Sequence, residues 1–231
     1  MKSAAMIKKM FGSKHVTYAT VLNSMALLYN ALGQTDKTTM LLLEASSIVK
    51  HQTGKYSLRY ATSLTNLSTL LQDTASRRWA LTEALNITEA LVGTQHAAYI
   101  NKLSHLISFY IESGNLAAAK EALNSGLHLT RTLYGEHSLN YASMIRSVGK
   151  VHEASQDYLL AEQSLKKAYT IAMEAGDTST FSIAPYEYAL ADFFTTTMRL
   201  DSAEHYLASY HKLLFSKVQS IAIMRFCSLK A

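Results

Sequence analysis

The sequence predicts an all-α protein, a right-handed α-solenoid of about five antiparallel helix pairs. The first reason is the scarcity of helix breakers, since the chain has one proline, Pro185, in 231 residues. The second is that apolar residues recur at spacings of three and four, which is the period of an α-helix. The third is an internal repeat, in which similar phrases return about every 42 residues.

The repeat is clearest around four tyrosines, whose separations are 42, 39 and 42 residues: Tyr18, Tyr60, Tyr99 and Tyr141. The phrases around them are HVTYATVLNSMALLY, YSLRYATSLTNLSTLL, HAAYINKLSHLISFY and HSLNYASMIRSVGKVH. A fifth, looser unit begins near Thr178. We therefore expect part of a preceding second helix at 1–14, repeats at 15–55, 56–95, 96–136, 137–177 and 178–215, and a capping or tail segment at 216–231. The step of 39 indicates that about one helical turn is missing near Gln72–Ser76.

In each unit an apolar stripe on one face predicts the first helix. The stripe positions are Leu22, Met25, Ala26 and Tyr29, then Leu64, Leu67 and Leu71, then Leu103, Leu106, Ile107 and Tyr110, and then Ile145, Val148, Gly149 and His152. A turn follows each stripe, at 33–36, 72–74, 114–115 and 155–157. Each turn contains Asn or Asp, whose side chain can accept hydrogen bonds from the free amides that begin the next helix.

The second helices carry alanine at recurring positions, with leucine four residues later. These residues are Ala119, Ala161 and Ala203, followed by Leu123, Leu165 and Leu207. Alanine lets two helices approach closely, and the leucine fills the space beside it. Two positions depart from the pattern, because Thr38 replaces the expected alanine and Glu187 stands where the other units have Leu or Ile.

This combination of positions resembles the tetratricopeptide repeat (TPR), and the 42-residue length is similar to the kinesin-light-chain variety. The phrasing resembles that of bacterial arrays of this type. The best-matching stretches are LTEALNITEALVGTQHAAYI and FGSKHVTYATVLNSMALLYNALGQ, and the resemblance covers roughly residues 4–215. It implies a TPR-like solenoid that serves as a protein-binding scaffold, while leaving the partner open because one fold hosts many roles.

Both ends of the sequence match the repeat less well. Residues 4–15 resemble the end of a second helix with its turn, so the sequence opens on half a unit. The tail from Ser216 does not match the repeat, although several of its residues are apolar: Ile221, Ile223, Met224, Phe226 and Leu229. We expect a helix that caps the last repeat, with a dimer contact or a membrane-surface helix as alternatives.

Composition narrows the class of protein. An apolar fraction of 48% and a charged fraction of 17% are typical of a globular chain. The single cysteine, Cys227, excludes an internal disulfide framework and a cysteine-based zinc site, and it favours a reducing compartment. No apolar run reaches the length of a membrane span, so a cytoplasmic location is expected.

The net charge of +5 is concentrated in residues 1–55, which carry seven lysines against Asp36 and Glu44. Such an end is usually a solvated surface and less often a patch for an acidic partner. It is too weak to indicate nucleic-acid binding.

The sequence shows no signature of catalysis. It contains no P-loop, dinucleotide fingerprint, His-Glu-x-x-His or nucleophile elbow, and we expect no enzymatic activity and no cofactor. His15, His96 and His137 occupy the same place before successive first helices, so we interpret them as turn or capping elements and expect no metal site. Cys227 lies outside the repeats, where no framework would hold a Cys–His pair.

The face of the first helices opposite the apolar stripe is the expected site of binding, because first helices line the concave side of such a solenoid. Short hydroxyl and amide side chains dominate this face and suit hydrogen bonds to an extended peptide. The candidate groove residues are Asn23, Asn66, Asn101, His105, Arg146 and Lys150, and the face also includes Thr20, Thr62, Thr65 and Thr69. Arg146 and Lys150 would favour an acidic segment at their end of the groove.

The leading hypothesis is a non-enzymatic scaffold that binds a peptide segment of a partner protein in its concave groove. The alternative is the regulatory array of a larger enzyme, resembling a caspase-like (CHAT-type) peptidase without its catalytic domain. An open reading frame that continues beyond Ala231 would favour this alternative. A third hypothesis is salt-sensitive binding of a membrane surface or acidic polymer by the basic end around Lys8, Lys9 and Lys14.

Overall fold

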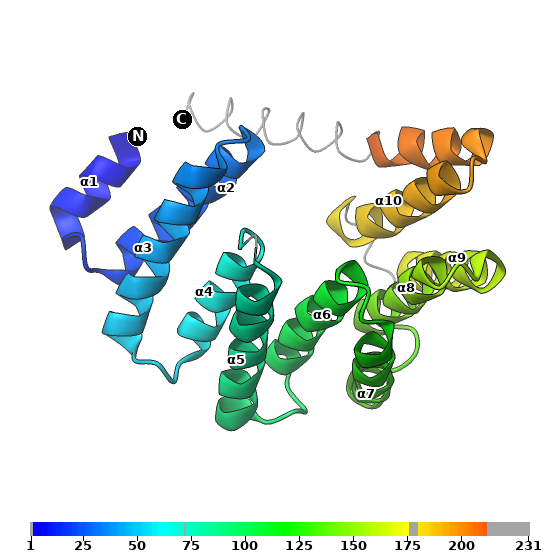
Figure 1. Ribbon diagram of the computed structural model, residues 1–231, viewed down its shortest axis with the longest axis horizontal. Helices are drawn as coiled ribbons and strands as arrows, with labels where there is room; N and C mark the ends of the chain where they lie inside the picture. Colours follow the sequence, from blue (N-terminus) through cyan, green and yellow to red (C-terminus); the bar gives the residue numbers. More distant parts are fainter. Residues whose placement is uncertain (1, 72, 176–179, 212–231) are drawn as a thin grey trace, which may run out of the picture. The chain divides into compact units, whose positions relative to one another are not determined.

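The computed structural model describes residues 2–71, 73–175 and 180–211, and within these ranges all regular secondary structure is helical. The helices are α1 (Lys2–Phe11), α2 (Val16–Ala31), α3 (Thr35–Thr53), α4 (Leu58–Ser68), α5 (Thr74–Val92), α6 (Ala97–Glu112), α7 (Leu116–Tyr134), α8 (Leu139–Ala154), α9 (Tyr158–Glu174) and α10 (Thr180–Thr196) (Figure 1). Residues 200–211 are also helical. The chain forms two compact units, residues 1–109 and 110–231. The predicted capping segment at 216–231 lies outside the described residues.

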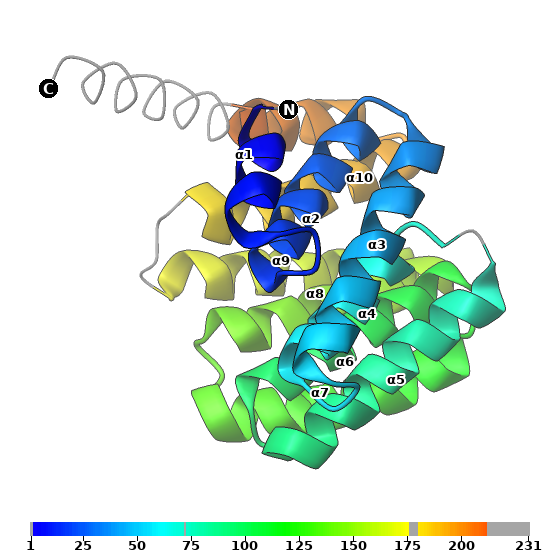
Figure 2. The same cartoon turned by 90° about the vertical axis from the view of Figure 1, so that its left-hand side faces the viewer.

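In the first unit each helix packs against the next one along the chain, from α1 on α2 to α4 on α5 (Figures 1 and 2). The core joins the stripe residues Leu22 and Leu64 to Ala45 and Ala84 of the second helices. The predicted stripe is therefore confirmed at its buried residues, whereas Met25, Tyr29 and Leu71 are only partly buried. In the unit with the short step, α4 has 11 residues where α2 and α6 have 16.

In the second unit α7 packs on α8, α8 on α9, and α9 on α10. Ala119, Ala161 and Ala203 are buried, as predicted. The prediction for Leu207 is wrong, because this side chain is partly exposed and its neighbour Tyr206 packs against the core instead.

The two departures from the repeat pattern are both buried. Thr38 takes the place of alanine because its hydroxyl donates to the backbone carbonyl of Gln34 at 2.9 Å, so its polar atom is satisfied inside the helix. The Glu187 carboxylate accepts a hydrogen bond from Ser209 Oγ at 2.5 Å. The Thr38 hydroxyl is thus satisfied, whereas the buried Oε2 of Glu187 has no hydrogen-bond partner among the described residues.

Glycine is required where the second helices end. Gly54 and Gly135 have φ of 80° and 78° with ψ of 164° and 168°, a region that side chains with a Cβ rarely enter. In the turn between the two helices of a unit, Gly33 and Gly114 have φ of 69° and 72°. Gln156 has φ of 62° at the matching place in its unit, which is a strained conformation for a residue other than glycine.

The helix caps largely follow the sequence. Asp73, Asn115 and Asp157 accept hydrogen bonds from backbone amides of α5, α7 and α9, as predicted. The capping prediction is wrong for the turn between α2 and α3. Gln34 is the N-cap of α3 and makes no side-chain capping bond, and Asp36 lies inside the first turn of the helix. The latter position is still favourable, because a negative charge near a helix N-terminus interacts well with the free amides.

The recurring histidines are only partly equivalent. His15 and His96 each accept a hydrogen bond at Nδ1 from the amide two residues later, at 3.2 and 3.0 Å, so their predicted capping role is confirmed. At the third site the N-cap is Ser138, and His137 Nδ1 lies 3.9 Å from Glu174 Oε2. Ser57 is likewise the N-cap of α4.

Candidate functional site

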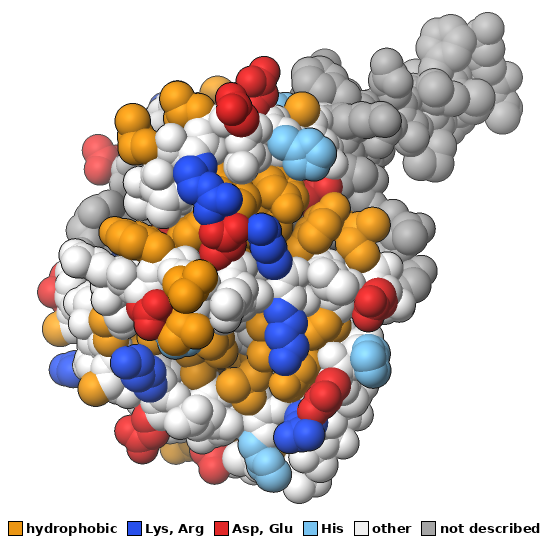
Figure 3. Space-filling view, turned by 90° about the vertical axis from the view of Figure 1, so that its right-hand side faces the viewer, with side chains coloured by type: hydrophobic (Ala, Val, Ile, Leu, Met, Phe, Trp, Pro, Cys, Tyr) orange, Lys and Arg blue, Asp and Glu red, His pale blue; other side chains and the backbone are white. Residues whose placement is uncertain are grey.

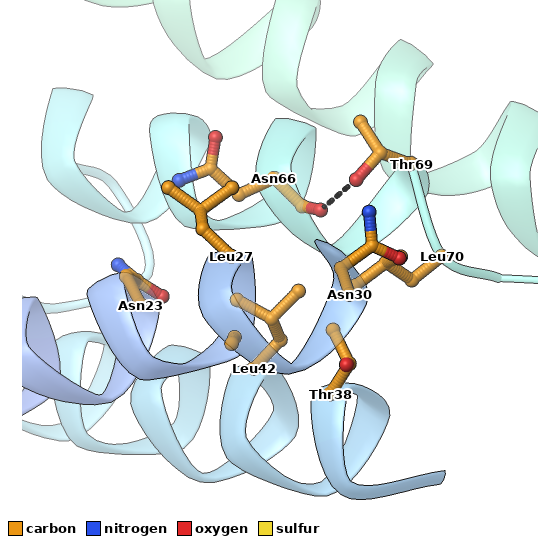
Figure 4. A pocket seen from close by; sticks show the side chains of 9 residues that line it. Asn23, Leu27, Asn30, Thr38, Leu42, Asn66, Thr69 and Leu70 are labelled. Carbon is orange, nitrogen blue, oxygen red and sulfur yellow. Dashed lines mark hydrogen bonds between the residues drawn. The ribbon is translucent and has the colours of Figure 1, made fainter. Parts of the chain in front are cut away.

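A pocket of about 150 Å³ opens between α2, α3 and α4 in the first unit (Figure 4). Its apolar wall includes Ala26, Leu27 and Leu42, and the hydroxyl of Thr69 donates to the Asn66 carbonyl at 2.8 Å. Three amide side chains line it: Asn23, Asn30 and Asn66. The structure records no hydrogen bond from these three amides to any described residue. The pocket therefore combines an apolar wall with amides that are free to donate and accept.

A second hollow, of about 380 Å³, lies between α2 and α4 and shares Asn23 with the pocket. Its polar lining includes Thr20, Arg59 and Thr62. The two threonine hydroxyls donate to helix carbonyls four residues earlier, at 3.3 and 2.9 Å. The Thr20 oxygen is consequently left as an acceptor.

On α6 the predicted residues Asn101 and His105 are exposed. Between them lies Lys102, which is 6% exposed and donates from Nζ to Thr62 Oγ1 of α4 at 3.2 Å. Burial lowers the pKa of Lys102. Desolvation by the surrounding protein lowers the pKa of His105, and the charge of Lys102 lowers it further.

Lys102 was not among the predicted site residues, although the sequence holds a signal for it. The matching positions of the other units are Val21, Ser63 and Met144, none of which is charged. A lysine in a column of small and apolar residues is a departure from the repeat that a column-by-column comparison could have found.

In the second unit Lys150 is already paired, whereas the buried Nε of Arg146 has no hydrogen-bond partner among the described residues. Lys150 Nζ lies 2.7 Å from Asp192 Oδ2 and 3.0 Å from Glu153 Oε2. Burial lowers the pKa of Lys150, but the hydrogen bonds to these two carboxylates outweigh it, so the pKa is raised overall. The Arg146 guanidinium lies 5.7 Å from the centre of the Tyr186 ring, and burial lowers its pKa. The charge of Lys150 is thus compensated within the unit.

Other charges of the second unit are paired too. Glu162 binds Lys166 at 2.7 Å and also binds Arg199, whose guanidinium lies 4.6 Å from the centre of the Phe194 ring. On the face in Figure 3, basic and acidic side chains lie next to one another with hydrophobic side chains between them. This surface carries mixed charge and does not present a continuous basic patch.

The first unit contains four of the six predicted site residues, of which Asn23 and Asn66 line one pocket, while Asn101 and His105 are exposed on α6. The assignment of Thr65 to the groove face is wrong, because Thr65 is buried and its hydroxyl donates to the Ala61 carbonyl at 3.0 Å. A threonine satisfied within its own helix can be buried at little cost, so its polarity alone does not place it at the surface. Asn30, on the same helix as Asn23, was not predicted.

Comparison with known proteins supports the fold. No protein-family model matches the chain. A clustered mitochondria protein homolog from Emericella nidulans is 19% identical over 174 residues, which cover 74% of this chain and 14% of that protein. The solved structure of BtubC (BKLC) from P. vanneervenii has a TM-score of 0.63 at 14% identity, covering 94% of this chain and 87% of that one.

A second solved structure is a kinesin-light-chain-type protein of Podosopora anserina with nearly identical TPR-like repeats. It has a TM-score of 0.59 at 14% identity and covers 88% of this chain and 98% of that one. The chain has a TPR-like fold. The resemblance seen in the sequence is thereby confirmed for the fold.

Two further features concern the described part of the TPR-like chain. No helix in it has the length and apolar character needed to cross a membrane. Nor do its histidine, cysteine and acidic side chains form any group of three or more that could hold a metal ion.

Proposed function

We propose that this chain is a non-enzymatic, cytoplasmic scaffold whose first-helix face in residues 16–105 binds an extended peptide segment of a partner protein. The observation that carries the proposal is the pocket between α2, α3 and α4, where three amides with no recorded hydrogen-bond partner among the described residues line an apolar wall. An extended peptide offers both N–H and C=O groups, and an amide side chain can bond to either.

The pocket gives the peptide an anchor in addition to backbone bonds. Leu27 is exposed at the pocket, and Leu42 is buried behind it. A volume of about 150 Å³ suits one aliphatic side chain of the peptide. Burying an apolar side chain there contributes about 1.5–3 kcal/mol, which is more than one neutral hydrogen bond contributes. We therefore assign affinity mainly to the anchor, and register and orientation mainly to the amides of Asn23 and Asn66.

Asn101 and His105 extend the proposed face along α6, and Arg146 and Lys150 remain proposed contacts of the second unit. Lys150 is the weakest of these, because a ligand carboxylate would compete with Asp192 and Glu153 for its ammonium group.

The test uses phage-displayed random decapeptides as the probe and the full chain as bait. The double variant Asn23→Ala, Asn66→Ala should bind a selected peptide about 30-fold more weakly than the wild type, because each amide contributes about 1 kcal/mol. The matched control is Asn86→Ala, since Asn86 is exposed on α5, a second helix of the same unit. Failure of the wild type to select any peptide, or equal affinity of the double variant, would contradict the proposal.

A further inference from the structure

The helix pair α2 and α3 carries an apolar surface, away from the amide-lined pocket, in a hollow of about 500 Å³. The residues that line it, called the α3 face below, are Met25, Tyr29, Lys37, Met40, Leu41, Leu43 and Glu44. Met40 is 70% exposed and Leu43 is 50% exposed. Large apolar side chains are therefore left in contact with water at this face.

The repeat shows that the fold does not need apolar side chains at these exposed places. In α7 and α9 the position of Met40 is taken by Glu121 and Gln163, and in α9 that of Leu43 is taken by Lys166. These polar residues are exposed, as Met40 and Leu43 are. Exposed apolar side chains that lie together on a surface are typical of an interaction site.

A later unit shows which kind of element covers such a face. Leu67 of α4 takes the position of Met25 and is buried, and α3, a second helix of 19 residues, packs on α4. The helix that packs on α2 is α1, which has 10 residues, and Met25 and Tyr29 are only partly buried. The α3 face is thus shaped to receive an α-helix of the second-helix type.

A second copy of the chain offers such a helix in its own α3. Lys37 and Glu44 are seven residues apart, about two helical turns, so they share the exposed side of α3 with Met40. When two α3 helices pack antiparallel about a two-fold axis at the level of Met40 and Leu41, Lys37 of each copy faces Glu44 of the other. Lys37 donates to Gln34 at 2.8 Å, and no ion pair of Lys37 or Glu44 is recorded in the described ranges. The face is therefore complementary to itself in charge.

We propose that the chain forms a two-fold homodimer through the α3 face, with α3 packed antiparallel against α3 of the second copy. Met40 and Leu43 supply most of the affinity, because burial of a large apolar side chain contributes more than an exposed ion pair. The two Lys37–Glu44 pairs fix the direction and register of the helices. The amide-lined pocket of the proposed function shares no lining residue with this face, so either proposal can fail without the other.

Sedimentation velocity of the full chain measures the assembly, and the wild type should pass from monomer to dimer between about 1 and 100 μM. Met40→Glu should weaken the dimer at least about 30-fold, the loss expected of a residue at the centre of an interface. The matched control is Leu159→Glu, because Leu159 of α9 is also 70% exposed, and it should leave the dimer unchanged. Circular dichroism checks that each variant is folded.

Charge reversal tests the antiparallel arrangement. Lys37→Glu and Glu44→Lys should each weaken the homodimer about tenfold, because like charges then face one another at both pairs. A mixture of these two single variants should instead form a heterodimer about as tight as the wild-type dimer, since each pair again joins a cation to an anion. A dimer that shows no preference for the mixed form would overturn the antiparallel packing.

A wild type that stays monomeric up to about 100 μM would overturn the inference, as would a dimer that Met40→Glu leaves intact. Oxidation by dilute peroxide, followed by peptide mass spectrometry, identifies the reason in a monomer. Protection of Met40 would mean that another segment of the chain covers the α3 face, and rapid oxidation would mean that nothing covers it. In the proposed dimer, oxidation of Met40 should slow as the protein concentration rises.

Discussion

Gly149 on α8 packs closely against α9. A Cβ added there would lie 2.7 Å from Leu165 Cγ, 2.8 Å from Leu165 Cδ2 and 3.3 Å from the Ala161 carbonyl oxygen. Carbon atoms in good contact are about 3.5–4.0 Å apart, so the overlap is close to 1 Å. Leu165 is 1% exposed and packs against Leu190 and the neighbouring phenylalanines, so it cannot move aside freely.

Two opposing effects set the magnitude for Gly149→Ala. Alanine is favoured over glycine in a helix by about 1 kcal/mol, whereas overpacking a rigid core costs about 1–3 kcal/mol. The geometry puts the steric effect ahead, so we expect the free energy of unfolding to fall by up to about 2 kcal/mol, which is the overpacking cost less the helix preference. Leu165→Ala alone should cost about 2–5 kcal/mol, because it leaves a cavity in the core.

The decisive variant is the double one. Once Leu165 is alanine, the added methyl group no longer overlaps it, and the helix preference for alanine remains. Gly149→Ala should therefore stabilise the Leu165→Ala background by about 0.5–1 kcal/mol, although it destabilises the wild type. Urea titrations of the four proteins, followed by circular dichroism, measure both effects. Stabilisation in the wild-type background, or the same sign in both, would refute the helix packing described for α8 and α9.

Other positions give further expectations. Ala161→Asp should cost at least about 2 kcal/mol in a denaturant titration, because it buries an unpaired carboxylate, and a loss within the surface norm of about 0.5 kcal/mol would show that Ala161 is not in the core. Gln156→Gly should raise the unfolding free energy by up to about 1 kcal/mol by relieving a positive φ, and a lower melting temperature would argue against this strain. Arg199 and Lys166 lower the pKa of Glu162 from its ordinary 4.5, so their stabilisation is present above that pH and is lost as the pH falls through the lowered value. Glu162→Gln should accordingly flatten the acid limb of a stability–pH curve, and an unchanged limb would contradict the pairing.

The fold could be predicted from the sequence because each structural position occurs once in every repeat. Leu22, Leu64, Leu103 and Ile145 occupy one column, and all four are buried. Recurrence corrects for chance at any single position, which is why the apolar stripe and the small residues of the second helices were predicted. Leu207 follows Leu123 and Leu165 at the same spacing, yet in the looser fifth unit this side chain is exposed and the prediction is wrong.

Only part of the candidate site could be predicted from the sequence. Asn23 and Asn66 followed from their place opposite the stripe, because a helix fixes which residues share a face. The pairing of Lys150 with Asp192 joins α8 to α10, 42 residues apart, and depends on the packing of two helices that no local pattern describes. Lys102 was missed for a related reason, since lysine is taken as exposed unless the structure shows otherwise.

The central claim is that the amide-lined pocket between α2, α3 and α4 is where a peptide binds. Side-chain amide resonances of asparagine report on this directly in a titration of the full chain with an end-blocked, selected decapeptide. The resonances of Asn23, Asn30 and Asn66 should shift on binding, while those of Asn86 and Asn124, exposed on second helices, should stay in place. Saturable binding that shifts the resonances of Asn86 or Asn124 and leaves those of the three pocket amides unchanged would contradict the claim.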